Sequence, residues 1–170
     1  DLMSAQTARP LLRTREDCRL CGSKDLVLLM SLGATPLAND FVSEASRGKT
    51  QERFPLDVYF CRGCAHVQLR DIVDPEVLFR NYVYVSSTSP VFVDHFRRYA
   101  QAMLALTGMP PGSRVVEIGS NDGILLRFFK EAGMQVLGID PARKIAEEAT
   151  RSGIPTLPEF FDLELAKRLR

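Results

Sequence analysis

Along residues 114–170 the apolar residues are grouped as expected for alternating strands and helices. An apolar run with one acid, Arg114–Ile118, is followed by a polar turn, and apolar residues then recur at helical spacing. A second apolar run, Gln135–Ile139, ends in Asp140. Short apolar runs separated by helical patterns predict a parallel sheet with right-handed crossovers. The predicted elements are strand 114–118, helix 123–132, strand 135–139, helix 141–153 opened by Pro141, a short third strand 154–157 and helix 163–170.

A longer helix is predicted before this region. Ser89 is a good N-cap, Pro90 fits the first helical position, and Gly108 is a typical stop. His95 lies beside the apolar face, where an exposed or hydrogen-bonded residue is favoured over a catalytic one. The apolar face would consist of Phe92, Phe96, Tyr99, Ala100, Met103 and Leu104.

The segment Tyr82–Ser89 has an unusual composition, because six of its eight residues carry hydroxyl groups. Alternating aromatic residues and valines are compatible with a half-buried strand. Hydroxyl groups also orient ligands without charge. A pocket-lining role and a simple connector that ends in a helix cap are therefore equally compatible with the composition.

The four cysteines form two Cys-x-x-Cys pairs, Cys18 with Cys21 and Cys61 with Cys64, with 39 residues between the pairs. Two such pairs close a tetrahedral four-sulfur site around one zinc ion. A redox-active dithiol is the alternative, but it has no use for a second matched pair. Because four thiolates leave no open coordination position, the predicted zinc is structural, and His66 is not expected to be a ligand.

Apolar runs flank both cysteine pairs, at residues 26–30, 57–60 and 67–69. Strand, turn and strand around each pair predict a zinc-ribbon module. The spacer is longer than the roughly 15–20 residues common for this signature. Residues 33–51 are therefore expected to form a surface excursion.

Charge and hydropathy limit the partners of the chain. Twenty-two basic and 21 acidic residues give a net charge of +1, which predicts no surface for nucleic acid or an anionic membrane. No run of about 18 apolar residues is present, and residues 1–15 lack the apolar core of a secretory signal. We therefore expect a cytoplasmic protein whose thiols stay reduced.

The turn at 119–123 predicts a nucleoside-bearing ligand, because such turns at the carboxyl ends of parallel strands bind nucleotides. A dinucleotide fingerprint requires glycine two positions after Gly119, where this chain has Asn121. Asp122 would also place negative charge near a pyrophosphate. A ligand without phosphate, whose amine favours nearby acids such as Glu117, fits better, and S-adenosylmethionine is such a ligand. Asp140 could accept hydrogen bonds from a ribose or act as the N-cap of the Pro141 helix.

The motifs Glu117–Gly123 and Gly138–Pro141 resemble those of class I S-adenosylmethionine-dependent methyltransferases. Together with the cysteine pairs, the intervening Pro36–Asn39 and the Tyr82–Ser89 segment, they resemble the sugar C-methyltransferases with an N-terminal zinc-binding domain. The resemblance runs from about Cys18 to the end of the chain. It implies an α/β protein with a small zinc-ribbon-like β module followed by the first part of a Rossmann-like methyltransferase domain. The implied parts are a zinc-binding module (1–75), a connecting segment and helix covering the cofactor site (76–108), and the first half of the cofactor-binding domain (109–170).

The resemblance also implies roles for individual residues. The substrate would be a keto-deoxysugar carried on a nucleotide, methylated at C3 after a base removes the proton next to the 4-keto group. Tyr82, Tyr84, Ser86 and Ser87 would line the substrate pocket. S-adenosylmethionine would be held by Glu117, Gly119, Ser120, Asn121, Gly123, Asp140 and Pro141, and structural Zn²⁺ by Cys18, Cys21, Cys61 and Cys64.

The chain departs from this family in extent. The general base of the family is expected beyond Arg170, and a complete class I sheet has more strands than are predicted here. We therefore expect that a C-terminal half or a partner chain is needed to complete the sheet. Two other functions stay open: a zinc-ribbon interaction module with a non-catalytic α/β tail, and an NAD-dependent sugar-nucleotide enzyme.

Overall fold

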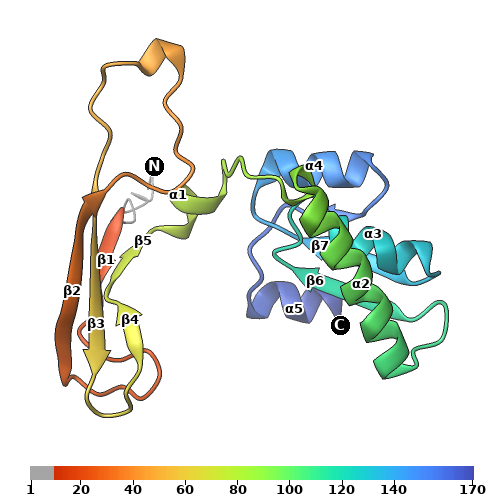
Figure 1. Ribbon diagram of the computed structural model, residues 1–170, viewed down its shortest axis with the longest axis horizontal. Helices are drawn as coiled ribbons and strands as arrows, with labels where there is room; N and C mark the ends of the chain where they lie inside the picture. The colour runs from red at the N-terminus through yellow and green to blue at the C-terminus, as the bar shows by residue number, and fades with distance from the viewer. Residues whose placement is uncertain (1–9) are drawn as a thin grey trace, which may run out of the picture. The chain divides into compact units, whose positions relative to one another are not determined.

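A computed structural model describes residues 10–170, which form two compact units with a boundary between Leu78 and Phe79 (Figure 1). The N-terminal unit consists mainly of strands, and the C-terminal unit contains a parallel sheet with helices. The predicted class, a small four-cysteine strand module followed by a parallel α/β region, is therefore confirmed. Of the predicted connecting segment and helix (76–108), residues 79–108 lie within the second unit.

The N-terminal unit is built on antiparallel strands. The central sheet has the order β2-β3-β4, formed by Leu26–Thr35, Phe54–Cys61 and Val67–Leu69. Strands β1 (Leu12–Thr14) and β5 (Asp71–Val73) pair separately, also antiparallel. A short helix α1 (Pro75–Phe79) follows.

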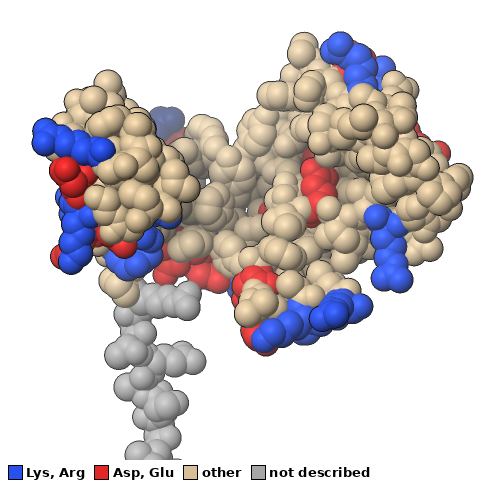
Figure 2. Space-filling view, turned by 90° about the horizontal axis from the view of Figure 1, so that it is seen from below, with Lys and Arg blue, Asp and Glu red and all other residues tan. Residues whose placement is uncertain are grey.

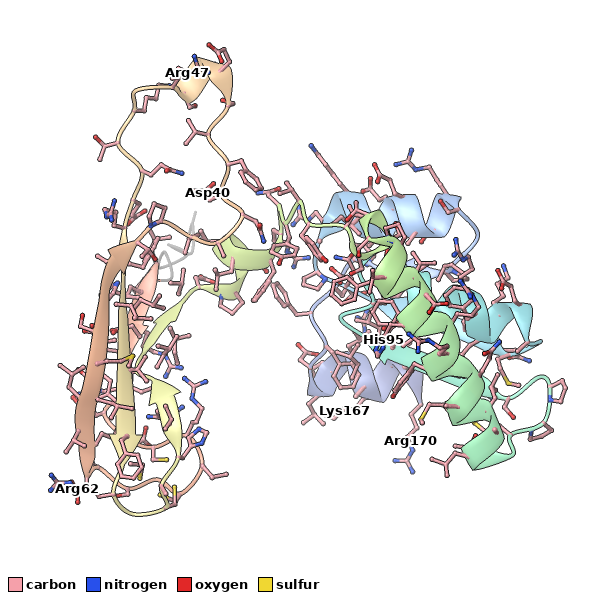
Figure 3. The ribbon with its side chains drawn as sticks, viewed as in Figure 1. Asp40, Arg47, Arg62, His95, Lys167 and Arg170 are labelled. Atoms are coloured by element: carbon pink, nitrogen blue, oxygen red, sulfur yellow. The ribbon has the colours of Figure 1, made fainter. Side chains whose placement is uncertain are left out.

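The excursion between the cysteine pairs is shorter than predicted. Strand β2 continues to Thr35, which pairs with Phe54 of β3, so the excursion covers residues 36–53 rather than 33–51. Two register irregularities, at 28–30 and 31–34, let β2 pass Gly33 and remain paired. The excursion contains the 3₁₀ turn η1 (Glu44–Ser46) and Arg47, which is labelled in Figure 3.

The core of the N-terminal unit is very small. Among its described residues, the buried apolar side chains are Cys18, Phe54 and Cys61. Strand β2 instead leaves Leu28, Leu29, Met30 and Leu32 each more than half exposed. Because so little apolar surface is buried, packing alone is a weak source of stability for a module of this size.

The C-terminal unit has a three-stranded parallel sheet of order β6-β7-β8, with the crossovers made by helices. The helix α2 begins at Pro90 after Ser89 and ends at Gly108, whose φ of 60° is left-handed, as predicted. The elements of the C-terminal unit are η2 (Ser86–Thr88), α2 (Pro90–Thr107), β6 (Arg114–Ile118), α3 (Ile124–Glu131), β7 (Gln135–Ile139), α4 (Arg143–Arg151), β8 (Thr156–Leu157) and α5 (Leu163–Leu169).

Helices α2 and α3 pack against each other and cover one face of the sheet (Figure 1). Their shared core has Ala100, Phe129 and Met134 at its centre, with Val115 of β6 packed against it. Successive residues of a strand point to opposite faces. Val116 (52% exposed) and Ile118 (59% exposed) therefore lie on the opposite face of β6, which is also an edge strand within the described residues.

Three local predictions are corrected. Residues 82–89 form no strand, because their backbone is paired with side chains of a distant turn and not with a neighbouring strand. Helix α4 begins at Arg143 and not at Pro141, and its N-cap position is Ala142 rather than Asp140. Phe92 and Tyr99 are nearly half exposed, because α2 turns its Ala100, Met103 and Leu104 side toward α3.

Gly123, in the turn after β6, packs closely against Ile154, the first residue of the segment predicted as the third strand. Its φ is 75°, and a Cβ at this position would lie 2.8 Å from Cγ2 of Ile154. Glycine therefore serves here both the left-handed backbone and the close approach. Within residues 10–170, no helix is long and apolar enough to cross a bilayer.

Candidate functional site

The four cysteine sulfur atoms of the N-terminal unit lie within 4.8 Å of one another. Cys18 Sγ is 3.7 Å from Cys64 Sγ, and Cys21 Sγ is 3.6 Å from Cys61 Sγ. A tetrahedral zinc ion with bonds of about 2.3 Å to sulfur requires sulfur–sulfur edges of about 3.8 Å. The donor set and its spacing thus fit a closed Zn²⁺ site, and they leave no position for a substrate.

The two cysteine turns have matching backbone hydrogen bonds. Gly22 N donates to Cys18 O over 2.9 Å, and Ala65 N donates to Cys61 O over 2.8 Å. Gly22 and Ala65 follow the second cysteine of each pair and both have left-handed backbones, with φ of 74° and 61°. Gly63, inside the second pair, does not have this conformation, and the left-handed residue there is Ala65. The two cysteine pairs thus adopt the same turn conformation.

The surroundings of the Cys18 and Cys64 thiols shift their pKa values in opposite directions. Backbone N–H groups, first that of Cys21, stabilise the Cys18 thiolate and lower its pKa from 9.0 to about 7. For Cys64 the backbone N–H of His66 acts in the same direction. The hydrogen bond with the Cys21 thiol, burial and the other two thiols outweigh it and raise the Cys64 pKa to about 12. Four crowded sulfur atoms therefore cannot all be thiolates without a cation between them.

Gln68 is a structural residue of this centre that motif reasoning missed. Its side chain is buried (5% exposed), accepts from Arg19 N over 2.9 Å and donates to Asp17 O over 3.1 Å. Strand β4 is thereby tied to the first cysteine turn. A glutamine in the centre of a short strand has no pattern that would reveal this role. His66 contributes its backbone oxygen to Cys61 N and is not part of the four-sulfur group.

The second candidate site is the turn between β6 and α3 in the C-terminal unit. Gly119, Asn121 and Gly123 have φ of 74°, 50° and 75°. Three left-handed residues in five fold the chain tightly back, and Gly119 N donates to Ile139 O of the neighbouring strand over 2.7 Å. The turn thus lies at the carboxyl ends of β6 and β7, where parallel α/β sheets bind their ligands.

Three buried polar atoms of this turn have no hydrogen-bond partner among the described residues: Glu117 Oε2, Ser120 Oγ and Asp122 Oδ1. Buried polar atoms are nearly always paired, so such a group marks a place where a ligand or solvent completes the bonds. Burial, and next the charges of Asp122 and Asp140, raise the pKa of Glu117 from 4.5 to about 7. Glu117, Asp122 and Asp140 therefore lie close enough to interact at the carboxyl ends of β6 and β7.

Each carboxylate oxygen of Asp140 accepts a hydrogen bond from a backbone N–H group. Its Oδ2 accepts from Asn121 N and its Oδ1 from Ala142 N, each over 2.8 Å. Asp140 is 8% exposed, and the half-buried Pro141 follows it. Each carboxylate oxygen has a further lone pair, so an additional ribose contact remains compatible with this arrangement.

The hydroxyl-rich segment is brought to the same turn. Asn121 Oδ1 accepts from Ser86 N and Asn121 Nδ2 donates to Tyr84 O, both over 2.9 Å. Asp122 Oδ2 accepts from Ser87 N over 3.0 Å. The predicted substrate-lining and cofactor-binding residues therefore meet at one place, although 35 residues separate Ser86 from Asn121.

The rings of Tyr82 and Tyr84 lie edge to face with centroids 6.5 Å apart. Tyr84 is 40% exposed. Such a pair of aromatic rings can pack against a flat or apolar part of a ligand.

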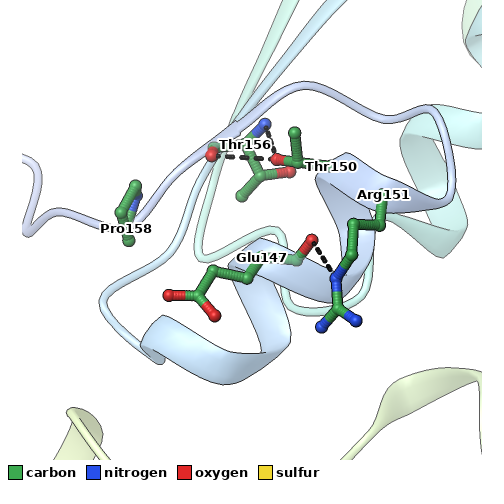
Figure 4. A pocket seen from close by; sticks show the side chains of 5 residues that line it. All are labelled: Glu147, Thr150, Arg151, Thr156 and Pro158. Carbon is green, nitrogen blue, oxygen red and sulfur yellow. Dashed lines mark hydrogen bonds between the residues drawn. The ribbon is translucent and has the colours of Figure 1, made fainter.

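Two hollows of the described residues lie away from the predicted site residues. One of about 380 Å³ on α4 and β8 is lined by Glu147, Thr150, Arg151, Thr156 and Pro158 (Figure 4). Within it, Thr156 N donates to Thr150 Oγ1 over 3.0 Å and Arg151 Nε donates to Glu147 O over 3.4 Å. His95, labelled on α2 in Figure 3, lies edge to face with Phe96 and tilted against Tyr99, with ring centroids 5.6 Å and 6.4 Å away.

Charged residues are distributed without a dominant sign. On the face of the described residues shown in Figure 2, lysine and arginine side chains lie in small groups interspersed with acids. This distribution matches the net charge of +1 and offers no extended basic track.

Comparison with known proteins indicates which class of protein this chain resembles. Residues 18–79 match the family model described as "Putative zinc binding domain", a span that contains both cysteine turns. The chain is also 36% identical over 159 residues to the C-methyltransferase NovU of Streptomyces niveus. The aligned region is 94% of this chain and 38% of the relative. The resemblance to C-methyltransferases with an N-terminal zinc-binding domain is thereby confirmed.

Replacing Cys61 by Ser should release the metal and unfold the N-terminal unit. Structural zinc contributes about 10–16 kcal/mol in small zinc peptides, far more than the few buried side chains of this unit can replace. We expect a metal content near zero by mass spectrometry and loss of dispersed amide signals from residues 10–78. Arg62→Ala, in the same turn, is the control and should keep both. Unchanged metal content in Cys61→Ser would contradict a four-cysteine site.

The raised pKa of Glu117 should make stability depend on pH. A carboxyl whose pKa is higher in the folded state stabilises the fold while protonated, below about pH 4.5, and this contribution is lost as the pH rises through about 7. Urea unfolding of the wild type and Glu117→Gln between about pH 5 and pH 8 should give curves that diverge, with the wild type losing stability at higher pH. The thiols titrate alike in both proteins, so the difference isolates Glu117. Parallel curves would contradict a buried, unpaired carboxyl.

Proposed function

We propose that this chain forms the methyl-donor half of an S-adenosylmethionine-dependent C-methyltransferase. The observation that carries the proposal is the pair of buried, unpaired carboxylate oxygens, Glu117 Oε2 and Asp122 Oδ1, at the turn after β6. The likeness to a C-methyltransferase over 94% of the chain supports the same reaction class.

The charge of the turn favours this cofactor over a dinucleotide. S-adenosylmethionine, when bound, supplies an electrophilic methyl group on a sulfonium, together with an ammonium group. Glu117 and Asp122 would accept hydrogen bonds from the ammonium, and Asp140 would contact the ribose. A pyrophosphate would instead meet these acids with like charge, in a place where burial weakens screening.

We assign structural Zn²⁺ to Cys18, Cys21, Cys61 and Cys64. The sulfur spacing and the family match of residues 18–79 support the assignment. The ion would hold both cysteine turns and take no part in methyl transfer, because four thiolates complete its coordination. A reducing compartment such as the cytoplasm would keep the thiols available.

For the acceptor we propose a keto-deoxysugar carried on a nucleotide, as the motif resemblance implies. A base outside residues 10–170 would remove the proton next to the keto group. The resulting enolate carbon, C3 by the motif resemblance, would bond to the methyl group as the bond from that group to the sulfonium sulfur breaks and S-adenosylhomocysteine leaves. Residues 82–87 would form the wall shared by cofactor and sugar. Their position at the Asn121–Asp122 turn supports that role.

We further propose that β6 pairs with additional strands, from further sequence or from a partner chain. The chain spans 38% of the length of the relative it matches, and β6 has Val116 and Ile118 more than half exposed. An uncovered edge strand with apolar residues is a site for pairing with another chain.

Calorimetry of the zinc-loaded chain with S-adenosylhomocysteine tests the cofactor. We expect saturable binding that Glu117→Gln weakens about tenfold, the size of a lost charged hydrogen bond. Glu131→Gln on the exposed side of α3 is the matched control and should bind as the wild type does. Binding should strengthen as the pH rises toward about 7, since the ammonium requires ionised Glu117.

Saturable binding of NAD in place of this ligand would favour the dinucleotide enzyme. Binding of neither ligand would favour the interaction module without catalysis. Equal affinity in the wild type and Glu117→Gln would contradict the assigned role of the buried acid.

Sedimentation velocity tests the exposed edge. If β6 is built to be covered, the isolated chain should self-associate at micromolar concentration, and Val116→Lys should make it monomeric. Lys24→Ala, at an exposed position of the other unit, should leave association unchanged. A wild type that stays monomeric and stable at high concentration would mean that this face is simply a solvent-exposed surface.

A further inference from the structure

Both polar atoms of the Asn121 side chain bind backbone. Its carbonyl oxygen accepts from Ser86 N and its amide nitrogen donates to Tyr84 O, each over 2.9 Å. A C=O and an N–H two residues apart are the groups that a neighbouring strand would bind. One side chain therefore replaces a strand at this point, and its printed partners are both backbone groups of the hydroxyl-rich segment.

The backbone conformation of Asn121 makes this possible. Its φ of 50° is left-handed, a conformation that asparagine tolerates better than most residues. The same residue donates its backbone N–H to Asp140 Oδ2 over 2.8 Å. Main chain and side chain thus connect two separate segments, the loop after β7 and the hydroxyl-rich segment.

Asp122 extends the connection toward the ligand turn. Its Oδ2 accepts from Ser87 N over 3.0 Å, whereas its Oδ1 is buried and has no partner among the described residues. One oxygen therefore holds residue 87, and the other faces the place assigned to the cofactor amine. The same carboxylate therefore holds the backbone of residue 87 and would contact a ligand bound at the turn.

Besides these bonds, Thr88 N and Oγ1 donate to Val85 O, and η2 lies against α2. Residues 84–87 belong to no sheet, Val83 is 55% and Tyr84 40% exposed, and η2 is a single 3₁₀ turn. The three hydrogen bonds to Asn121 and Asp122 join their backbone to the turn. Local order with few buried contacts depends strongly on such individual bonds.

We propose that Asn121 is a positioning residue, which clamps the backbone of residues 84–86 against the turn and thereby sets the affinity of the turn for its ligand. Asp122 divides its carboxylate between the clamped segment and the ligand. The inference rests on the proposed function for the identity of the ligand, but the clamp itself is a property of the chain. It differs from the role suggested by the motif, in which Asn121 would contact the cofactor directly.

Asn121→Gly removes the side chain and keeps the left-handed backbone at no steric cost. Amide exchange followed by NMR should show faster exchange at Ser86, by about tenfold or more, and calorimetry with S-adenosylhomocysteine should show affinity reduced by about tenfold. The amides of Leu126 and Ile139 in the core should exchange as in the wild type, which shows that the fold persists. Asn39→Gly is the matched control, because Asn39 has φ of 61° in the other unit, and it should change neither measurement.

Asp122→Asn separates clamping from ligand contact. Its amide oxygen can still accept from Ser87 N, so protection of Ser87 should persist while ligand affinity falls. Unchanged protection of Ser86 in Asn121→Gly, or lost protection with unchanged affinity, would overturn the positioning role. If the wild type binds no S-adenosylhomocysteine but Asn121→Gly still frees Ser86, the proposed function fails together with the link to affinity, and the clamp alone remains.

Discussion

The buried carboxylate of Asp140 is the interaction on which the ligand turn depends. Its two oxygens hold the backbone N–H groups of Asn121 and Ala142, which belong to the loops after β6 and β7. Because these parallel strands end at the same edge of the sheet, one side chain can fix both loops. Charge-assisted hydrogen bonds are about twice as strong as neutral ones, so the turn keeps its strained shape. Glu117 and Asp122 can then present unpaired oxygens without the backbone collapsing onto them.

The N-terminal unit solves a different problem, which is to fold with almost no core. Its buried apolar residues include two of the four cysteines, so the metal centre and the hydrophobic centre coincide. Gln68 completes this centre by bonding to the first cysteine turn from β4. The C-terminal unit instead relies on the packing of Ala100, Phe129 and Met134 between helices and sheet. Metal coordination in one unit thus does what side-chain packing does in the other.

Local patterns sufficed for the parts of the fold that depend on local chemistry. Strands β6 and β7, helix α2 with its Gly108 stop and the pairing of the cysteine turns all follow from periodicity, caps and spacing. The segment 82–89 could not be predicted, because its conformation is fixed by side chains about 35 residues away. The same holds for Ala65, since nothing in an alanine announces a left-handed backbone. Asn121 did carry a signal: an asparagine in a glycine-rich turn often adopts this conformation.

The pairing of Thr35 with Phe54 closes the excursion at residues 36–53 before the chain returns to the second cysteine turn. The entropy of closing a flexible loop grows only with the logarithm of its length, by about 0.6 kcal/mol for each doubling. The free-energy cost of a longer spacer between the cysteine pairs is therefore small once β2 and β3 are paired. Such a segment can change in length and composition during evolution with little effect on the metal centre, and this explains how the module carries a spacer longer than ordinary zinc ribbons.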